Sequence, residues 1–90
     1  MYTLVLTKEA NKFLNKINPQ DKTAILTKLH NLATDPFAPN KNIKPLKGHD
    51  RLYRLRVGDY RIIYHIHNQE LKIQVVKVGH RKDVYTLITQ

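Results

Sequence analysis

The sequence predicts one α+β domain, residues 1–90, in which an N-terminal strand and a helical hairpin pack on a mainly antiparallel sheet (β-α-α-β-β-β). Three observations lead to this fold class. A chain of 90 residues suits one domain with a modest core. Apolar residues in the first third recur with helical spacing, and the second half alternates between apolar and polar residues, which is typical of strands.

The N-terminal segment is expected to form a short strand and then a helix. Residues 1–6, "MYTLVL", are the strand candidate, and Thr7 can cap a helix over residues 7–17, "TKEANKFLNKI". The apolar residues of this helix follow the spacing i, i+3, i+4, i+7: Ala10, Phe13, Leu14 and Ile17. This spacing gives the helix one apolar face.

A second helix is predicted directly after the first. Asn18 is a suitable N-cap, and Pro19 fits the first helical turn. The residue before a proline avoids the α region, so Asp35 is expected to end the helix. The apolar stripe consists of Ile25, Leu29, Leu32 and Ala33. Because the link between the helices is short, they should form an antiparallel hairpin.

The rest of the chain reads as one long loop and three strands. Residues 36–50 hold three prolines and are expected to form the loop. Strands are predicted over residues 52–57, 60–67 and 70–78, and Gly58-Asp59 fits a two-residue hairpin turn between the first two. The alternation within these strands predicts an apolar face that packs on the helices and an open face that is polar.

The open face carries Arg54, Arg56 and Arg61. Arg54 and Arg56 share a face because side chains alternate along a strand, and the hairpin should bring Arg61 beside them. Like charges this close repel unless an anion lies among them, and guanidinium groups match phosphate geometry. The pattern therefore favours a phosphate or a phosphodiester as ligand.

Composition supports an anionic partner. Sixteen Lys and Arg residues oppose seven acidic residues, which gives a net charge of +9 and favours a nucleic acid or an acidic protein. The absence of cysteine excludes disulfides and thiolate metal sites, and we expect no metal or cofactor. We find neither a membrane-spanning apolar run nor a signal peptide, and therefore expect a cytoplasmic protein.

The segments "YRLRVGDYRIIYHI" and "VVKVGHRKDVY" resemble the RelE family of bacterial and archaeal toxins, within the RelE/ParE superfamily. The resemblance spans nearly the whole chain. It implies the toxin of a type II toxin–antitoxin system, which enters the ribosomal A site and cuts mRNA there by metal-free attack of the ribose 2′-hydroxyl on the phosphodiester. It also implies an acidic RelB-like antitoxin as partner, with the toxin alone a monomer.

The resemblance also assigns roles to individual residues. Arg54 and Arg56 occupy the positions of two basic residues that are usually lysines in the family, and they would stabilise a developing alkoxide. Arg61 and Arg81 match the arginines that hold the phosphate. Tyr85 matches the tyrosine that orients the substrate.

Because arginine accepts a proton poorly, arginine at both lysine positions leaves open which residue transfers protons in the reaction. His80, which stands beside Arg81, is the first candidate for this role, and His65 and His49 are alternatives. Lys41, Lys44, Lys47 and Arg51 are candidate contacts to ribosomal RNA, although ordinary solvated side chains would give the same pattern.

Two other functions fit the same features. A ParE-like toxin would share the fold, lack nuclease residues and inhibit DNA gyrase. A non-catalytic RNA-binding module would also present a basic surface. Charge alone does not separate these three functions, because all of them involve polyanions or acidic proteins.

Overall fold

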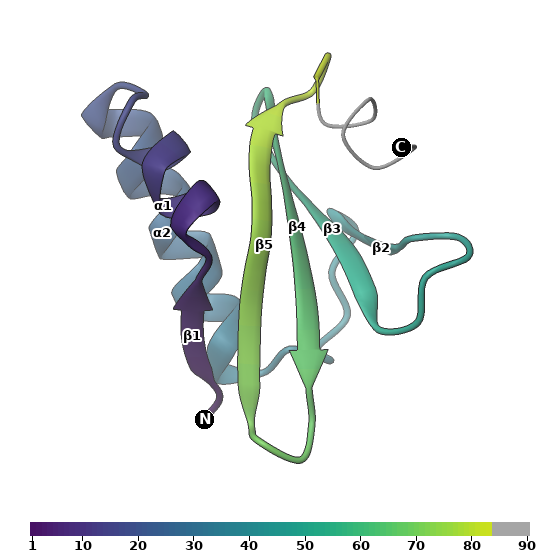
Figure 1. Ribbon diagram of the computed structural model, residues 1–90. Helices are drawn as coiled ribbons and strands as arrows, with labels where there is room; N and C mark the ends of the chain where they lie inside the picture. Colours follow the sequence, from purple (N-terminus) through teal and green to yellow (C-terminus); the bar gives the residue numbers. More distant parts are fainter. Residues whose placement is uncertain (84–90) are drawn as a thin grey trace.

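The computed structural model describes residues 1–83, in which two helices lie against one face of a five-stranded sheet (Figure 1). The elements in chain order are β1 (Thr3–Leu6), α1 (Lys8–Leu14), α2 (Pro19–Thr34), β2 (Ile43–Pro45), β3 (Leu52–Val57), β4 (Tyr60–His67) and β5 (Lys72–His80). The sheet order is β1-β5-β4-β3-β2. This arrangement confirms the predicted α+β fold class.

Both helices begin at the predicted caps. The Thr7 hydroxyl accepts a hydrogen bond from the Ala10 amide at 3.2 Å, and the Asn18 side chain accepts one from the Asp21 amide at 2.8 Å. Each cap satisfies an amide that has no partner inside its helix. Helix α1 ends at Leu14, earlier than its apolar stripe predicts.

The sheet is mainly antiparallel, as predicted, and it gains one edge strand that the sequence did not indicate. Strand β1 pairs with β5 in parallel, whereas every other strand pair is antiparallel, so the sheet is mixed. Part of the predicted loop 36–50 forms the edge strand β2, which pairs with β3. Pro45 lies in β2, and proline is tolerated there because an edge strand has one side without ladder hydrogen bonds.

The hairpin turns are close to the prediction. Gly58 and Asp59 connect β3 to β4, and Gly58 has φ +57°, a conformation that glycine adopts without strain. The next turn is longer than predicted. Leu71 has φ 50°, outside the strand region, so β5 begins at Lys72 and continues to His80.

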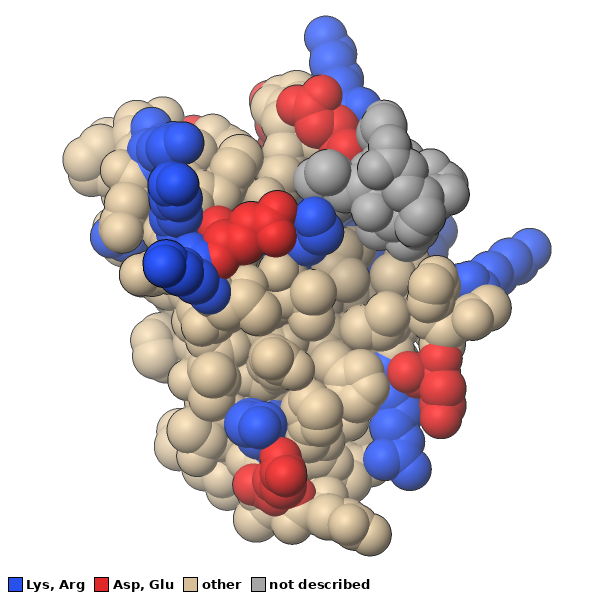
Figure 2. Space-filling model, in the orientation of Figure 1, with Lys and Arg blue, Asp and Glu red and all other residues tan. Residues whose placement is uncertain are grey.

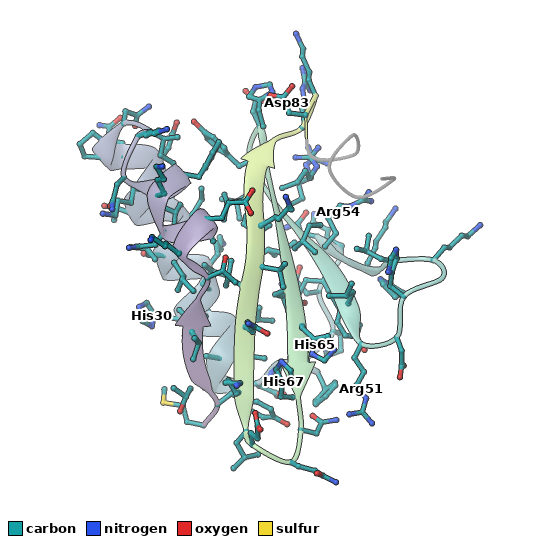
Figure 3. All side chains as sticks on the ribbon, viewed as in Figure 1. His30, Arg51, Arg54, His65, His67 and Asp83 are labelled. Atoms are coloured by element: carbon teal, nitrogen blue, oxygen red, sulfur yellow. The ribbon has the colours of Figure 1, made fainter. Side chains whose placement is uncertain are left out.

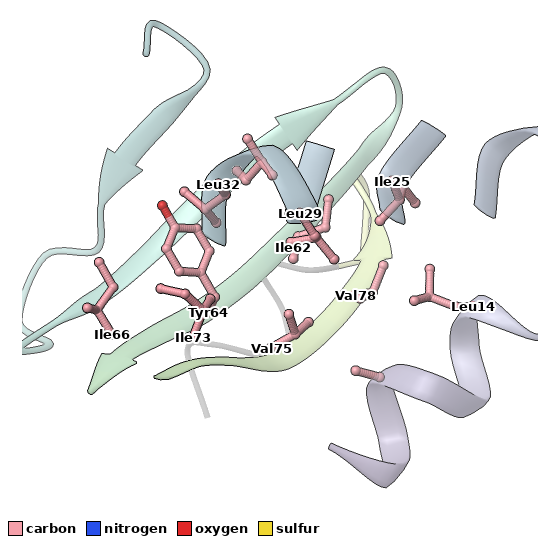
Figure 4. Packing of buried hydrophobic residues seen from close by; sticks show 12 residues of the cluster. Leu14, Ile25, Leu29, Leu32, Ile62, Tyr64, Ile66, Ile73, Val75 and Val78 are labelled. Atoms are coloured by element: carbon pink, nitrogen blue, oxygen red, sulfur yellow. The ribbon is translucent and has the colours of Figure 1, made fainter. Parts of the chain in front are cut away.

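The core lies between the helices and the sheet (Figure 4). It contains the apolar side chains of both predicted helical stripes and of one sheet face, including Leu14, Ile25, Leu29, Ile62 and Val75. Burial of these side chains is the main source of stability. No helix within residues 1–83 is long and apolar enough to span a membrane.

Candidate functional site

Strands β2, β3 and β4 bring basic side chains together on the sheet face that is opposite to the helices. Lys44 of β2 pairs with Arg54 of β3, and Arg56 of β3 pairs with Arg61 of β4. These side chains line a cavity of about 170 Å³, here called the arginine hollow. Its lining residues are Lys41, Asn42, Lys44, Arg54, Arg56 and Arg61. The predicted grouping of the three strand arginines is therefore present.

Arg61 is held in place by backbone carbonyls. Its Nη1 donates hydrogen bonds to the Gly58 carbonyl at 3.0 Å and to the Tyr60 carbonyl at 2.9 Å. These bonds tie the guanidinium to the β3–β4 turn, which restricts its rotamers before any ligand arrives. A group that is already oriented loses less entropy on binding.

The arginine hollow is strongly electropositive. Among residues 1–83, no aspartate or glutamate contributes to its lining. Arg56 is exposed, while Arg54 and Arg61 are half-buried. Neighbouring cationic groups repel one another in the absence of an anion, and a phosphate can accept hydrogen bonds from several guanidinium groups at once. The hollow is therefore suited to a phosphate group.

Arg81 lies next to the same turn but does not line the arginine hollow. Its amide donates to the Asp59 carbonyl at 2.8 Å, and its Nε is 3.9 Å from Asp59 Oδ1. Arg61 and Arg81 are thus both anchored at the β3–β4 turn. Tyr85, the predicted substrate-orienting residue, lies outside the residues that the structure describes.

His80, the first candidate for proton transfer, is not among the residues that line the arginine hollow. It pairs with Tyr60 on the helical side of the sheet, and it lines a separate cavity of about 360 Å³ together with Asp21. The cause is a register shift in the β4–β5 ladder, where Ile63 pairs with Lys77 but Tyr64 pairs with Val75. One extra residue in β5 reverses the face on which all later side chains lie.

The structure brings two of the four predicted RNA-contact residues to the arginine hollow and places the other two elsewhere. Lys41 and Lys44 line the arginine hollow, and Asn42, which the sequence did not indicate, lies between them. Lys47 is exposed in the β2–β3 loop. Arg51 directly precedes β3, at the end of the sheet that is opposite to the β3–β4 turn (Figure 3).

His65 and His67 share that opposite end with Arg51 (Figure 3). Their ring centroids are 4.2 Å apart, and His67 Nε2 is 3.1 Å from Gln74 Oε1. Desolvation by burial lowers the pKa of His65, and the neighbouring His67 and Arg51 lower it further. Within residues 1–83, no cluster of three potential metal-ligating residues is present. His65 is not among the residues that line the arginine hollow.

Positive charge also covers other parts of the surface. In the view of Figure 2, Lys and Arg side chains lie along the helical edge, near the end of β5 and beside the β2–β3 loop, and acidic side chains adjoin several of them. Lys77, for example, is 3.0 Å from Glu9. Net charge alone therefore does not locate the site, whereas the clustering of arginines does.

These features define a small basic α+β protein in which arginine and lysine side chains line a cavity on the open sheet face. Residues 4–85 match the family described as the ParE toxin of the type II toxin–antitoxin system parDE, and the chain belongs to this family. It is a type II toxin of the RelE/ParE superfamily, which confirms the superfamily that the sequence motifs indicated.

Relatives named as RelE and RelG toxins support the same assignment. The chain is 28% identical to putative toxin RelE1 of Methanocaldococcus jannaschii over 93% of this chain and 94% of that protein. It is also 28% identical to toxin RelG of Mycobacterium tuberculosis, over 93% and 95% of the two chains. The toxin in the RelE–RelB complex of Pyrococcus horikoshii superimposes with a TM-score of 0.78 at 28% identity, over 89% of this chain and 94% of that chain.

Proposed function

We propose that this toxin is a ribosome-dependent mRNA endoribonuclease that cuts the codon in the ribosomal A site and so inhibits translation. The observation that carries this proposal is the arginine hollow, where Arg56 and Arg61 are cross-strand partners beside Arg54. RNA phosphodiesters gain charge in the transition state, and preorganised cationic donors stabilise that charge. One relative is named as a RelE toxin, and this activity is the one that the resemblance to the RelE family implies.

The proposed reaction is a transesterification without metal. The ribose 2′-hydroxyl attacks the adjacent phosphorus, and the products are a 2′,3′-cyclic phosphate and a 5′-hydroxyl. Arg61 binds the scissile phosphate, and Arg54 and Arg56 stabilise the negative charge that develops on its oxygens. Arg81, anchored at the same turn as Arg61, adds a further cation, and Tyr85 orients the substrate.

The proposed partners are the ribosome with its mRNA and an acidic RelB-like antitoxin, and the proposed site of action is the cytoplasm. The P. horikoshii structure is a RelE–RelB complex. A net charge of +9 suits fast, salt-sensitive association with an acidic protein. An amphipathic antitoxin helix that covers the basic face would block access of RNA to the arginine hollow.

A second candidate function is inhibition of DNA gyrase. The observation that favours it is the matching family, whose description names a ParE toxin. A gyrase inhibitor has no need of a preorganised phosphate site. The arginine hollow is therefore the feature that gives the nuclease the stronger support.

Incubation of the purified toxin with mRNA-programmed ribosomes distinguishes the two candidates. We expect cleavage within the A-site codon and a 2′,3′-cyclic phosphate on the upstream fragment. A parallel supercoiling assay measures DNA gyrase activity. Intact mRNA together with inhibited gyrase would overturn the nuclease proposal, and intact mRNA with retained RNA binding would point to a non-catalytic module.

A further inference from the structure

Lys44 occupies a position in the site that its place in the sequence does not suggest. Its segment reads as a loop, but the structure places it in β2, directly opposite Arg54 of β3. The β2–β3 pairing is reinforced by a 2.9 Å hydrogen bond from the Arg56 amide to the Asn42 carbonyl. The backbone of Lys44 is thus fixed by the same sheet that carries the arginines.

The chemistry of the arginine hollow needs a group that can release a proton. When the bond between phosphorus and the 5′-oxygen breaks, the leaving oxygen must be protonated. Guanidinium groups stabilise charge but retain their protons, whereas a lysine ammonium can act as a proton donor. Among residues 1–83, the two amines that line the hollow are those of Lys41 and Lys44. Lys41 precedes the strand, and Lys44 lies within it.

We propose that Lys44 is the general acid of the cleavage reaction, an assignment that rests on the proposed nuclease function. The 2′-oxygen bonds to phosphorus and its proton passes to solvent water. The bond between phosphorus and the 5′-oxygen breaks, and its electron pair stays on that oxygen. The Lys44 ammonium transfers a proton to the 5′-oxygen and regains a proton from water afterwards. Lys44 is thus a catalytic residue rather than a general contact to ribosomal RNA.

The test compares two RNA substrates on programmed ribosomes. One has the natural 5′-oxygen at the scissile bond, and the other has a bridging 5′-sulfur, which leaves readily as a thiolate without protonation. Lys44→Arg keeps the positive charge, but a guanidinium group releases a proton far less readily than an ammonium group does. We expect Lys44→Arg and Lys44→Ala to cleave the oxygen substrate about 10²–10⁴-fold more slowly than wild type, the usual range for general acid–base catalysis. Both variants should cleave the sulfur substrate at close to the wild-type rate.

Controls separate this role from simple charge or folding effects. Lys12→Arg is the matched control, because Lys12 is an exposed lysine of α1 on the other side of the sheet. Circular dichroism and urea unfolding confirm that each variant is folded. Wild-type cleavage of the oxygen substrate by Lys44→Arg would refute the proposal, as would equal slowing of both substrates. If wild-type toxin cleaves neither substrate, the nuclease function itself fails, which is a distinguishable outcome.

Discussion

Arg56 of β3 and Arg61 of β4 are direct cross-strand partners on the open face of the sheet. Like charges that face each other across two strands destabilise a sheet, whereas opposite charges or β-branched pairs stabilise it. The sequence thus places a locally unfavourable pair among the residues that line the arginine hollow. Such a pair is expected where a bound anion, rather than the folded chain alone, supplies the compensating interaction.

Replacement of Arg56 should therefore stabilise the toxin while it weakens the site. Arg56→Thr removes one charge of the pair and introduces a residue that suits a strand. We expect the free energy of unfolding to rise by about 0.2–1 kcal/mol in low salt. The gain should shrink in high salt, where repulsion between exposed charges is screened. Urea denaturation at two ionic strengths measures both effects.

Arg56→Thr should cleave mRNA more slowly than the wild type even though it is more stable. The substitution removes a cation that the proposed mechanism places beside the transition state, so mRNA cleavage on programmed ribosomes should fall. Arg56→Lys is the matched comparison, because it retains the charge. A variant that is more stable and also fully active would show that the like-charge pair has no role in RNA cleavage.

Arg61 should be the most sensitive arginine of the hollow. Two carbonyl hydrogen bonds hold its guanidinium in place, and removal of one preorganised transition-state donor typically costs about 10²–10³ in rate. We expect Arg61→Ala to lose this much mRNA cleavage and to relieve growth arrest. Arg81→Ala should also reduce toxicity strongly. Growth arrest at the wild-type level by the Arg61→Ala, Arg81→Ala double variant would reject both assignments.

Tyr64→Phe should stabilise the fold. Tyr64 is fully buried and stacks on Tyr53 at 5.6 Å, and within residues 1–83 its hydroxyl has no hydrogen-bond partner. Burial also raises the pKa of Tyr64 well above its usual value. A buried polar group without a partner carries a desolvation cost of about 1–3 kcal/mol, and phenylalanine keeps the ring stack. Thermal and urea unfolding measure the change, and a destabilised Phe variant would contradict the prediction.

Stability should fall in mild acid because of His65. The pKa of His65 in the folded state is lowered from 6.5, mainly by burial. The unfolded state therefore binds the proton more readily than the folded state, and the free energy of unfolding decreases as pH falls through about 6.5 and below. Urea unfolding between pH 7.5 and about pH 5 measures this slope.

His65→Gln provides the matched test of that slope, because glutamine does not titrate. The decrease in stability over this pH range should be smaller in His65→Gln than in the wild type. His49→Gln serves as the control, since His49 is an exposed residue of the β2–β3 loop. An unchanged slope in His65→Gln would assign the pH dependence to other groups.

The sequence by itself determined the helix caps, the apolar stripes and the alternation of β3 and β4. Thr7 and Asn18 act on amides only a few residues away, so their effects do not depend on distant parts of the chain. The Gly58-Asp59 turn fixes the register of its two strands in the same local way. For this reason the grouping of Arg54, Arg56 and Arg61 could be predicted before the fold was known.

Only the tertiary structure decided which further residues join the site. Strand β2 exists because a segment with weak strand character pairs with β3, and that pairing brings Lys44 opposite Arg54. The extra residue in β5 turns His80 toward the helices. The first outcome depends on the pairing of two strands, and the second on a register shift, and the periodicity of a single segment reveals neither. Side-chain alternation describes one strand, whereas a site on a sheet also requires the alignment between strands.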